Sequence, residues 1–195
     1  MIKVAIIVGS TRPGRRADSV ARWVHEKAKG RADAQFDIVD IKDFDLPLLD
    51  EPMPPSMAQY TKPHTKAWAK TIDSYDAFVF VTPEYNHGPS AALKNALDFL
   101  YAEWNNKAAA FVSYGASAGG SRAVEQLRQV VGELQIADVR AQVVLSLISD
   151  FENYTIFKPN ATHEKNLNIL FDQLLSWGAA LKTVRSEKVV AKAAA

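Results

Sequence analysis

The chain has 195 residues, of which 48% are hydrophobic and 23% charged, and its formal net charge is +1. This composition is typical of one globular domain rather than of a disordered, fibrous or membrane chain, and the near-neutral charge argues against binding to nucleic acid or an anionic membrane. The absence of cysteine excludes disulfides, thiol catalysis and cysteine-ligated clusters, so any redox activity must come from a bound cofactor.

The first predicted element is a strand over residues 2–8, a continuous β-branched run typical of a strand buried on both faces. The run is short, has no basic region before it and leads directly into a glycine-rich turn. We therefore interpret it as a strand and not as a signal peptide. No stretch approaches the roughly 18–20 apolar residues that cross a bilayer, so we expect a cytoplasmic protein.

Strands and helices alternate along the rest of the chain. The elements that follow are, in order, a helix over 17–29, a strand over 36–41, a helix over about 60–74, a strand over 77–81, a helix from the N-cap Ser90 to about 104, a strand over 108–113, a helix over 121–134, a strand over 139–147 and a final helix over 164–184. Proline predicts a long surface loop between the second strand and the second helix. The prolines of this region are Pro47, Pro52, Pro54, Pro55 and Pro63.

Five strands that alternate with helices predict an α/β fold with a parallel sheet covered by helices on both faces. The expected arrangement is a flavodoxin-like three-layer sandwich with strand order 2-1-3-4-5. We assign residues 1–185 to one domain and expect residues 186–195, rich in alanine and lysine, to form a flexible tail. Ligands of such sheets bind beyond the carboxyl ends of the strands, which directs attention to the loops after the first, third and fourth strands.

The loop after the first strand, residues 9–16, predicts a phosphate site. Backbone N–H groups at a helix N-terminus favour an anion, and three arginines add guanidinium groups suited to phosphate. The spacing of its glycines resembles a Walker A loop, but Arg15 and Arg16 replace the lysine and the hydroxyl residue that nucleotide hydrolysis needs. The dinucleotide fingerprint is also absent, so a monophosphate fits best.

The loop after the third strand, residues 82–89, contains two prolines and a glycine around Tyr85, Asn86 and His87. Such a stiff loop with a flat ring and an amide can border a planar heterocycle. It can equally be a rigid turn with a tyrosine packed on the surface. The residues alone leave these two interpretations open.

The loop after the fourth strand, residues 113–121, is rich in glycine, which lets the backbone approach a ligand closely. It also matches the nucleophile-elbow pattern G-x-S-x-G with Ser117 at its centre, and Asp150 and His163 follow in the order of a serine hydrolase. Five strands are few for that fold, and no oxyanion segment precedes Ser117. No histidine pair has helical metal-ligand spacing, so we expect no metal site.

Three segments carry a resemblance to a known family: VGSTRPGRR, FVTPEYNHGPSAALKNALDFLY and SYGASAGGSRAVEQLR. Together with a weaker match at LPLLDEP, they make most of residues 2–145 similar to the NADPH-dependent FMN reductases. These are flavodoxin-like flavoproteins that include bacterial quinone, azo-dye and chromate reductases. The combination of PEYN, LKNALD and GSTRPGR makes the resemblance specific.

The resemblance implies noncovalently bound FMN, with NADPH or NADH as co-substrate. The cofactor-binding residues that it implies are Ser10, Arg12, Arg15 and Ser19 at the 5′-phosphate, Pro83, Glu84, Tyr85 and Asn86 along the isoalloxazine ring, and Tyr114 and Gly115 at the pyrimidine end of the ring. No catalytic side chain is implied, because the cofactor carries the chemistry.

The family mechanism implies that hydride passes from NAD(P)H through N5 of FMN to a small-molecule acceptor such as a quinone or an azo compound. Both substrates would use one flavin face in turn, which predicts ping-pong kinetics. A flavodoxin-type electron carrier and an FMN-binding interaction module are alternatives with the same fold. An electron carrier of the flavodoxin type is expected to be an acidic protein that docks to its redox partners, so the net charge of +1 disfavours this alternative. A serine hydrolase that uses Ser117 is the alternative from another class.

The helix predicted after Ser90 bears on assembly. One stripe of it is apolar through Leu93, Leu97, Leu100 and Trp104, and Ala92, Phe99 and Ala102 make the opposite side apolar as well. Such a helix is usually buried on two sides. One side can face the sheet and the other a partner subunit, and the resemblance favours a homodimer or a homotetramer.

Overall fold

The five strands form one parallel sheet in the order β2-β1-β3-β4-β5 in the computed structural model, which describes residues 1–193. The strands are β1 (Ile2–Val8), β2 (Ala34–Asp40), β3 (Ala77–Pro83), β4 (Lys107–Gly115) and β5 (Ile136–Ser146), and a separate hairpin consists of β6 (Phe151–Glu152) and β7 (Ile156–Phe157). This order confirms the predicted flavodoxin-like fold. Every residue of β3 and β4 is buried, as expected for central strands covered on both faces.

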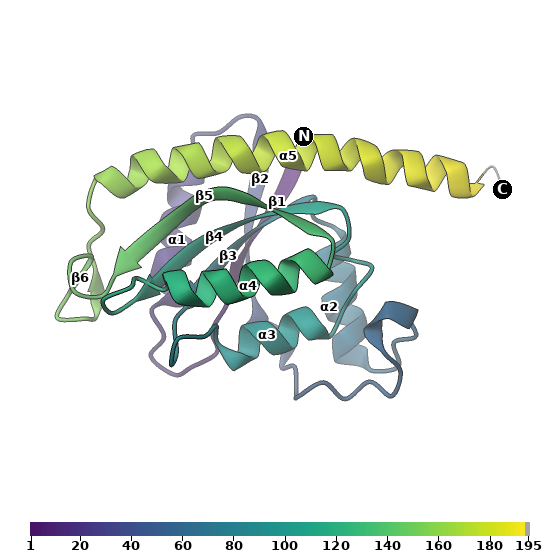
Figure 1. Ribbon diagram of the computed structural model, residues 1–195, viewed down its shortest axis with the longest axis horizontal. Coiled ribbons are helices and arrows are strands. Elements are labelled where there is room, and N and C mark those ends of the chain that lie inside the picture. Colours follow the sequence, from purple (N-terminus) through teal and green to yellow (C-terminus); the bar gives the residue numbers. More distant parts are fainter. Residues whose placement is uncertain (194–195) are drawn as a thin grey trace.

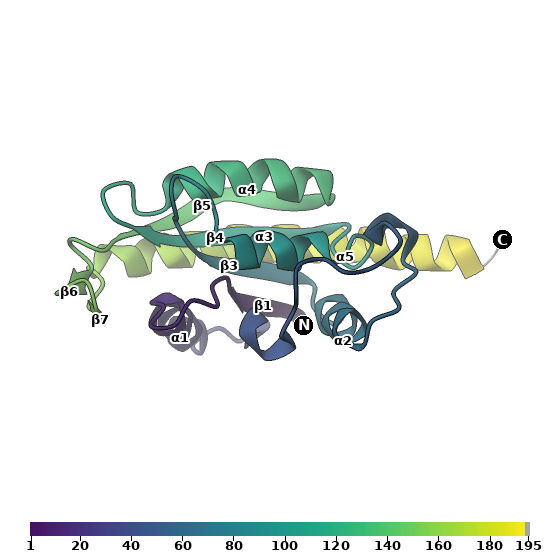
Figure 2. The ribbon, with the colours of Figure 1, turned by 90° about the horizontal axis from the view of Figure 1, so that it is seen from below.

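Helices cover both faces of the sheet and complete the three layers (Figures 1 and 2). The helices are α1 (Ala17–Ala28), α2 (Pro63–Asp73), α3 (Ala91–Asp98), α4 (Ser121–Glu133) and α5 (Thr162–Ala193), with short 3₁₀ turns η1 (Ile41–Phe44) and η2 (Pro55–Met57). One core lies between the sheet and α1 and α5, and the other lies between the sheet and α2, α3 and α4. Within the described residues, none of these helices is long and apolar enough to cross a membrane.

Helix α3 begins as predicted but is shorter. The side chain of Ser90 accepts a hydrogen bond from the Leu93 amide at 3.1 Å, which confirms Ser90 as the N-cap. The helix ends at Asp98 and not near Trp104. Trp104 is fully buried instead, and its indole N–H donates to the Leu97 carbonyl at 3.2 Å, so the chain turns here to enter β4.

This geometry also removes the reason given above for a partner subunit. Phe99, Leu100 and Trp104 are each at most 1% exposed within their own chain. The large apolar residues of the segment therefore belong to the core of their own chain, while Ala92 is half-buried and Ala102 is exposed, so the apolar pattern does not require a second copy.

Helix α2 begins at Pro63, three residues after the predicted start. Proline fits the first helical turn because its missing N–H has no partner there, so Pro63 belongs to the helix and not to the preceding loop. Helix α5 extends along the sheet and continues past it, as Figure 1 shows. Its backbone is helical through Ala193, residues 194–195 lie outside the described part, and flexibility of the segment 186–195 stays a prediction.

Candidate functional site

The three loops singled out in the sequence meet at the carboxyl edge of the sheet. We call them the phosphate loop (residues 9–16), the ring loop (residues 83–90) and the glycine loop (residues 115–120). The hydroxyls of Ser10 and Tyr85 lie 3.1 Å apart, and Ser90 Oγ donates to the Gly9 carbonyl at 2.5 Å. The Glu84 amide donates to the Tyr114 carbonyl at 3.1 Å. The topology thus assembles one site from segments that are distant in sequence, with Ser10 and Tyr85 75 positions apart.

The phosphate loop is held tightly against β3. The Gly9 amide donates to the Val81 carbonyl at 2.8 Å, and a Cβ on Gly9 would lie 2.7 Å from that same oxygen. Only glycine allows this approach. Ser10 follows and is 1% exposed, so its hydroxyl lies on the inner side of the loop.

Arg12 lies at the edge of the site, where its guanidinium is exposed. Its side chain is exposed, and its guanidinium carbon lies 5.6 Å from the centre of the Tyr85 ring. Among the described residues it makes no ion pair with a carboxylate. An anion bound to the phosphate loop would find this guanidinium unneutralised.

Arg15 is placed differently. It is paired with Asp40 and with Asp18, the latter at 2.8 Å, and it donates to the Ser10 carbonyl at 2.5 Å. Burial acts to lower the pKa of Arg15, but the hydrogen bonds that it donates to Asp40 and Asp18 outweigh this effect and raise the pKa. Arg15 therefore braces the phosphate loop, and its role as a direct phosphate ligand stays a prediction.

The first turn of α1 is open to an anion. Its N-cap residue, Arg16, gives no side-chain hydrogen bond to the turn, so the first amides have no cap. Arg16 itself donates to the Tyr154 carbonyl at 3.0 Å, which ties the β6–β7 hairpin to the site; sequence reasoning missed this contact. Ser19 is half-buried in the same turn and donates to the Arg16 carbonyl at 2.9 Å.

The ring loop is a tight turn. Tyr85 and Gly88 exchange two backbone hydrogen bonds of 2.9 and 3.0 Å, and between them Asn86 and His87 both have positive φ, 50° and 68°. This pair of left-handed residues is typical of a type I′ turn. Pro83 is buried at the start of the loop, whereas Asn86 is exposed at its tip.

Arg122 fixes the ring loop from α4, and the sequence analysis did not identify it. Its Nε donates to Glu84 at 2.6 Å, and its Nη1 donates to His87 Nε2 at 2.6 Å. The Glu84 side chain is only 6% exposed, so this carboxylate is held by its partner. A cation in the first turn of a helix is unfavourable next to the positive end of the helix dipole, and this unusual position is the feature of the sequence that indicates a partner for Arg122.

The glycine loop packs closely against its own strand. Gly120 has φ of 88°, and a Cβ there would lie 2.7 Å from Ser113 Cβ and 2.9 Å from the Tyr114 amide nitrogen. Gly115 ends β4 at the same place, where a Cβ would lie 2.8 Å from the Gly120 nitrogen. The glycines here serve the tight turn that brings the loop back over β4.

The structure lacks the triad that a serine hydrolase needs. His163 Nε2 lies 3.0 Å from Asp150, but its Nδ1 is buried and has no partner, whereas Ser117 is exposed on the glycine loop. Asp150 also accepts hydrogen bonds from the amides of Ser146 and Asn160, at 2.8 and 3.0 Å, and so orders the chain after β5. The hydrolase alternative is wrong because no serine of residues 1–193 is hydrogen-bonded to the histidine.

Tyr114 lies at the end of β4 and is 4% exposed, yet its hydroxyl has no hydrogen-bond partner among the described residues. Burial raises the pKa of Tyr114, and the nearby Tyr85 raises it further, so the hydroxyl stays protonated at neutral pH. A buried polar atom without a protein partner is uncommon, and it marks a place where a bound polar group can lie.

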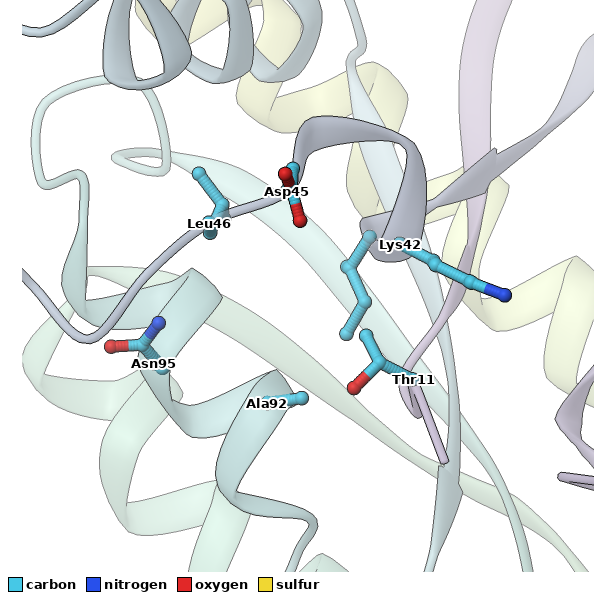
Figure 3. Close-up of a pocket in the computed structure, with 7 residues that line it drawn as sticks. Thr11, Lys42, Asp45, Leu46, Ala92 and Asn95 are labelled. Atoms are coloured by element: carbon cyan, nitrogen blue, oxygen red, sulfur yellow. The ribbon is translucent and has the colours of Figure 1, made fainter. Parts of the chain in front are cut away.

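A cavity of about 260 Å³ adjoins the phosphate loop on its α3 side. Figure 3 shows Thr11 at its edge, with Lys42 and Asp45 on one wall and Ala92 and Asn95 of α3 on the other. The Asn95 side chain donates to the Pro47 carbonyl at 2.6 Å and accepts from the Leu49 amide at 3.0 Å. These bonds anchor the proline-rich loop to α3 beside the cavity.

Comparison with known proteins identifies relatives over most of the chain. The family model for NADPH-dependent FMN reductase matches residues 2–150. An NAD(P)H-dependent FMN reductase from Nectria sp. is 46% identical over 66% of this chain and 67% of its own, and one from Schizosaccharomyces pombe is 41% identical over 86% and 84%. A probable NADPH:quinone oxidoreductase from Oryza sativa is 36% identical over 66% and 64%.

Solved structures agree with the fold. The flavoenzyme NAD(P)H:(acceptor) oxidoreductase FerB from Paracoccus denitrificans aligns with a TM-score of 0.70 over 92% of this chain and 98% of its own, at 19% identity. At this identity the likeness shows the shared flavodoxin-like architecture.

Proposed function

The chain belongs to the NADPH-dependent FMN reductase family and is therefore an oxidoreductase that uses FMN and NAD(P)H. On this basis we propose that it reduces quinones, azo compounds or similar small acceptors by a ping-pong mechanism. The observation that carries the proposal is the meeting of the phosphate, ring and glycine loops at one edge of the sheet. This edge, beyond the carboxyl ends of the strands, is where sheets of this order bind ligands.

The residues at this edge fit FMN. Three features suit a phosphate: the first turn of α1 without a side-chain cap, the guanidinium of Arg12, which pairs with no carboxylate in the part of the chain that the structure describes, and the buried hydroxyl of Tyr114. We propose that the phosphate lies against the phosphate-loop residues and that the ring lies along the ring loop. The proposed ligands are Ser10, Arg12, Arg15 and Ser19 for the phosphate, Pro83, Glu84, Tyr85 and Asn86 for the ring, and backbone groups of Tyr114 and Gly115 for its pyrimidine end.

Bound FMN would supply the chemistry of hydride acceptance and donation. The chain's own residues position it and limit its surroundings. Arg122 neutralises Glu84 and holds the ring loop in its turn. Tyr85 forms one wall of the proposed flavin site, and the Arg12 guanidinium lies over the face of its ring. We propose no acid or base among the side chains, in keeping with a reaction carried by the cofactor.

A ping-pong mechanism has a kinetic test. Initial rates with NADPH and a soluble quinone, each varied at several fixed levels of the other, are expected to give parallel lines in double-reciprocal plots. Intersecting lines would mean that both substrates bind together and would contradict the shared face. Repeating the series with an azo dye tests the wider range of acceptors.

Replacing Arg12 by alanine is expected to weaken FMN binding by about 1.5–3 kcal/mol, the range for a hydrogen bond to a charged group. This corresponds to a dissociation constant about 10- to 150-fold higher, measured by flavin fluorescence titration. Arg22→Ala is the matched control, because Arg22 is also exposed and lies on α1 away from the loop. An unchanged dissociation constant for Arg12→Ala would remove this arginine from the site.

We also propose that the chain forms a homodimer or homotetramer in the cytoplasm. Support for self-association comes from the proline-rich loop, where Leu48 is 83% and Met57 49% exposed. The loop is ordered, because Glu51 accepts hydrogen bonds from the amides of Thr61 and Lys62 at 2.8 and 2.9 Å. Sedimentation velocity is expected to give a dimer or a tetramer, and a monomer at micromolar concentration would contradict this part of the proposal.

A further inference from the structure

We propose that the Tyr114 hydroxyl donates a hydrogen bond to the FMN phosphate, and that this side chain adds to the protein's selection of FMN over riboflavin. The inference rests on the proposed function and assigns to Tyr114 a role beyond its backbone contact. It concerns the phosphate and not the ring.

The sheet register places Tyr114 beside the phosphate loop. Val8 of β1 pairs with Val81 of β3, and Val81 pairs with Val112 of β4, so these three residues lie in one row across the sheet. Two residues further along the chain come Ser10, just after β1, and Tyr114, near the end of β4, so both lie at the carboxyl edge of the sheet.

The side chain of Tyr114 also lies on the correct face of the sheet. Val112 and Tyr114 both belong to the core that includes α1, as alternation along the strand requires. Ala17, the first residue of α1, is fully buried in that same core. The ring of Tyr114 thus extends along the α1 side of the sheet toward the uncapped first turn of the helix.

The charged surroundings agree with this direction. After burial itself, the pKa of Tyr114 is raised by Tyr85 and lowered by Arg12, by the nearby Ala17 amide and by Arg15. All four border the phosphate loop. Because Arg15 is neutralised by Asp40 and Asp18, the positive potential that the hydroxyl faces comes from Arg12 and the N-terminus of α1, where a phosphate would be attracted.

The packing of Tyr114 is explained by its ring, which phenylalanine would also supply, and not by its hydroxyl. No hydrogen bond of ordinary geometry reaches it within the described residues, and the nearby Ala17 amide can approach only its oxygen, which leaves its O–H free to donate; the ring centre lies 6.4 Å from that of Phe151. A buried hydroxyl without a partner destabilises the protein, whereas the same hydroxyl bonded to an anion stabilises the complex. The molecule thus carries in its flavin-free state a polar group that the phosphate would satisfy.

The test uses flavin-free protein titrated separately with FMN and with riboflavin, which lacks the phosphate. In Tyr114→Phe, the dissociation constant for FMN is expected to rise roughly tenfold or more, as for a lost hydrogen bond to a charged group, while that for riboflavin stays the same. Tyr101→Phe is the control, because Tyr101 precedes β4 at the opposite edge of the sheet. An unchanged FMN constant, or an equal rise for both flavins, would overturn the inference.

A second readout does not depend on binding. Flavin-free Tyr114→Phe is expected to unfold at the same or a higher urea concentration than the wild type, because the unbonded hydroxyl is gone. A lower midpoint would show that the hydroxyl already has a partner in the protein and would overturn the inference. If the wild type binds neither flavin, the proposed function itself fails and the inference falls with it; if only the variant's selectivity is unaltered, the inference alone fails.

Discussion

Replacing Gly120 by alanine is expected to lower the free energy of unfolding by about 2–5 kcal/mol. A left-handed conformation costs an L-residue roughly 1–2 kcal/mol, and Gly120 has φ of 88°. The added Cβ would also lie within 3.0 Å of Ser113 Cβ and of the Tyr114 backbone, and displacing backbone costs about 1–3 kcal/mol more. Urea unfolding of the flavin-free protein measures the difference.

Gly132→Ala, within the helix α4 that follows Gly120, is the matched control. A Cβ on Gly132 would meet no atom within 4 Å, and alanine in a helix is about 0.5–1 kcal/mol more favourable than glycine. The control should therefore be slightly more stable than the wild type. If both variants change stability in the same direction and to the same extent, the close packing described for the glycine loop is wrong.

Replacing Asp76 by asparagine is expected to lower the free energy of unfolding by about 2–4 kcal/mol at pH 7. Asp76 is buried at the amino edge of the sheet, where its carboxylate accepts from Lys182 at 2.8 Å and from Arg185 at 2.5 Å. It also accepts from the Lys3 amide at 3.0 Å. Breaking a buried ion pair costs about 3–5 kcal/mol, and the value is reduced here because Lys182 is 45% exposed.

The effect should depend on pH. Burial acts to raise the pKa of Asp76, but the hydrogen bond from Lys182, with the other contacts, outweighs it and the net pKa is lowered. A carboxylate with a lowered pKa contributes stability above its unfolded value near 4, and this is lost as the pH falls through the folded pKa. The difference in free energy of unfolding between the wild type and Asp76→Asn should therefore narrow below about pH 4 and stay constant from pH 5 to 8.

Asp172→Asn provides the comparison for this network. Asp172 lies on α5, as Lys182 and Arg185 do, and pairs with Arg31 after α1, but it is 66% exposed, and exposed pairs contribute about 0–1 kcal/mol. A loss as large as that of Asp76→Asn would mean that burial is not what makes the Asp76 network strong. A loss below 1 kcal/mol in Asp76→Asn would mean that α5 is held by its apolar contacts alone.

The sequence predicts the fold well where patterns are local. The apolar runs of the strands and the serine at position 90 indicate their elements directly, because burial on both faces and helix capping are properties of a few adjacent residues. Helix α3 is mispredicted at its end because what stops it, the insertion of Trp104 into the core, depends on packing against the sheet. No spacing of apolar residues distinguishes a helix face that contacts a partner from one that contacts its own chain.

The site divides in the same way. The three loops are predictable because the carboxyl edge of a parallel sheet brings together the loops of neighbouring strands. The partners of their charged groups are not. Arg15 and Arg12 have the same side chain in the same loop, yet only Arg15 meets Asp40, which arrives from the neighbouring strand β2. Likewise, the bond between Arg122 and Glu84 joins residues 38 positions apart, and no local pattern indicates it.

The central claim, that this chain is an FMN-dependent NAD(P)H oxidoreductase, has one direct test. The purified protein is reconstituted with FMN, freed of unbound flavin, and its visible absorption is followed anaerobically on addition of NADPH and then of a quinone. The account predicts a flavin spectrum that NADPH bleaches and that the quinone restores. A protein that retains no flavin would contradict the assigned site, and a retained flavin that neither NADPH nor NADH bleaches would contradict the reductase and favour an electron carrier.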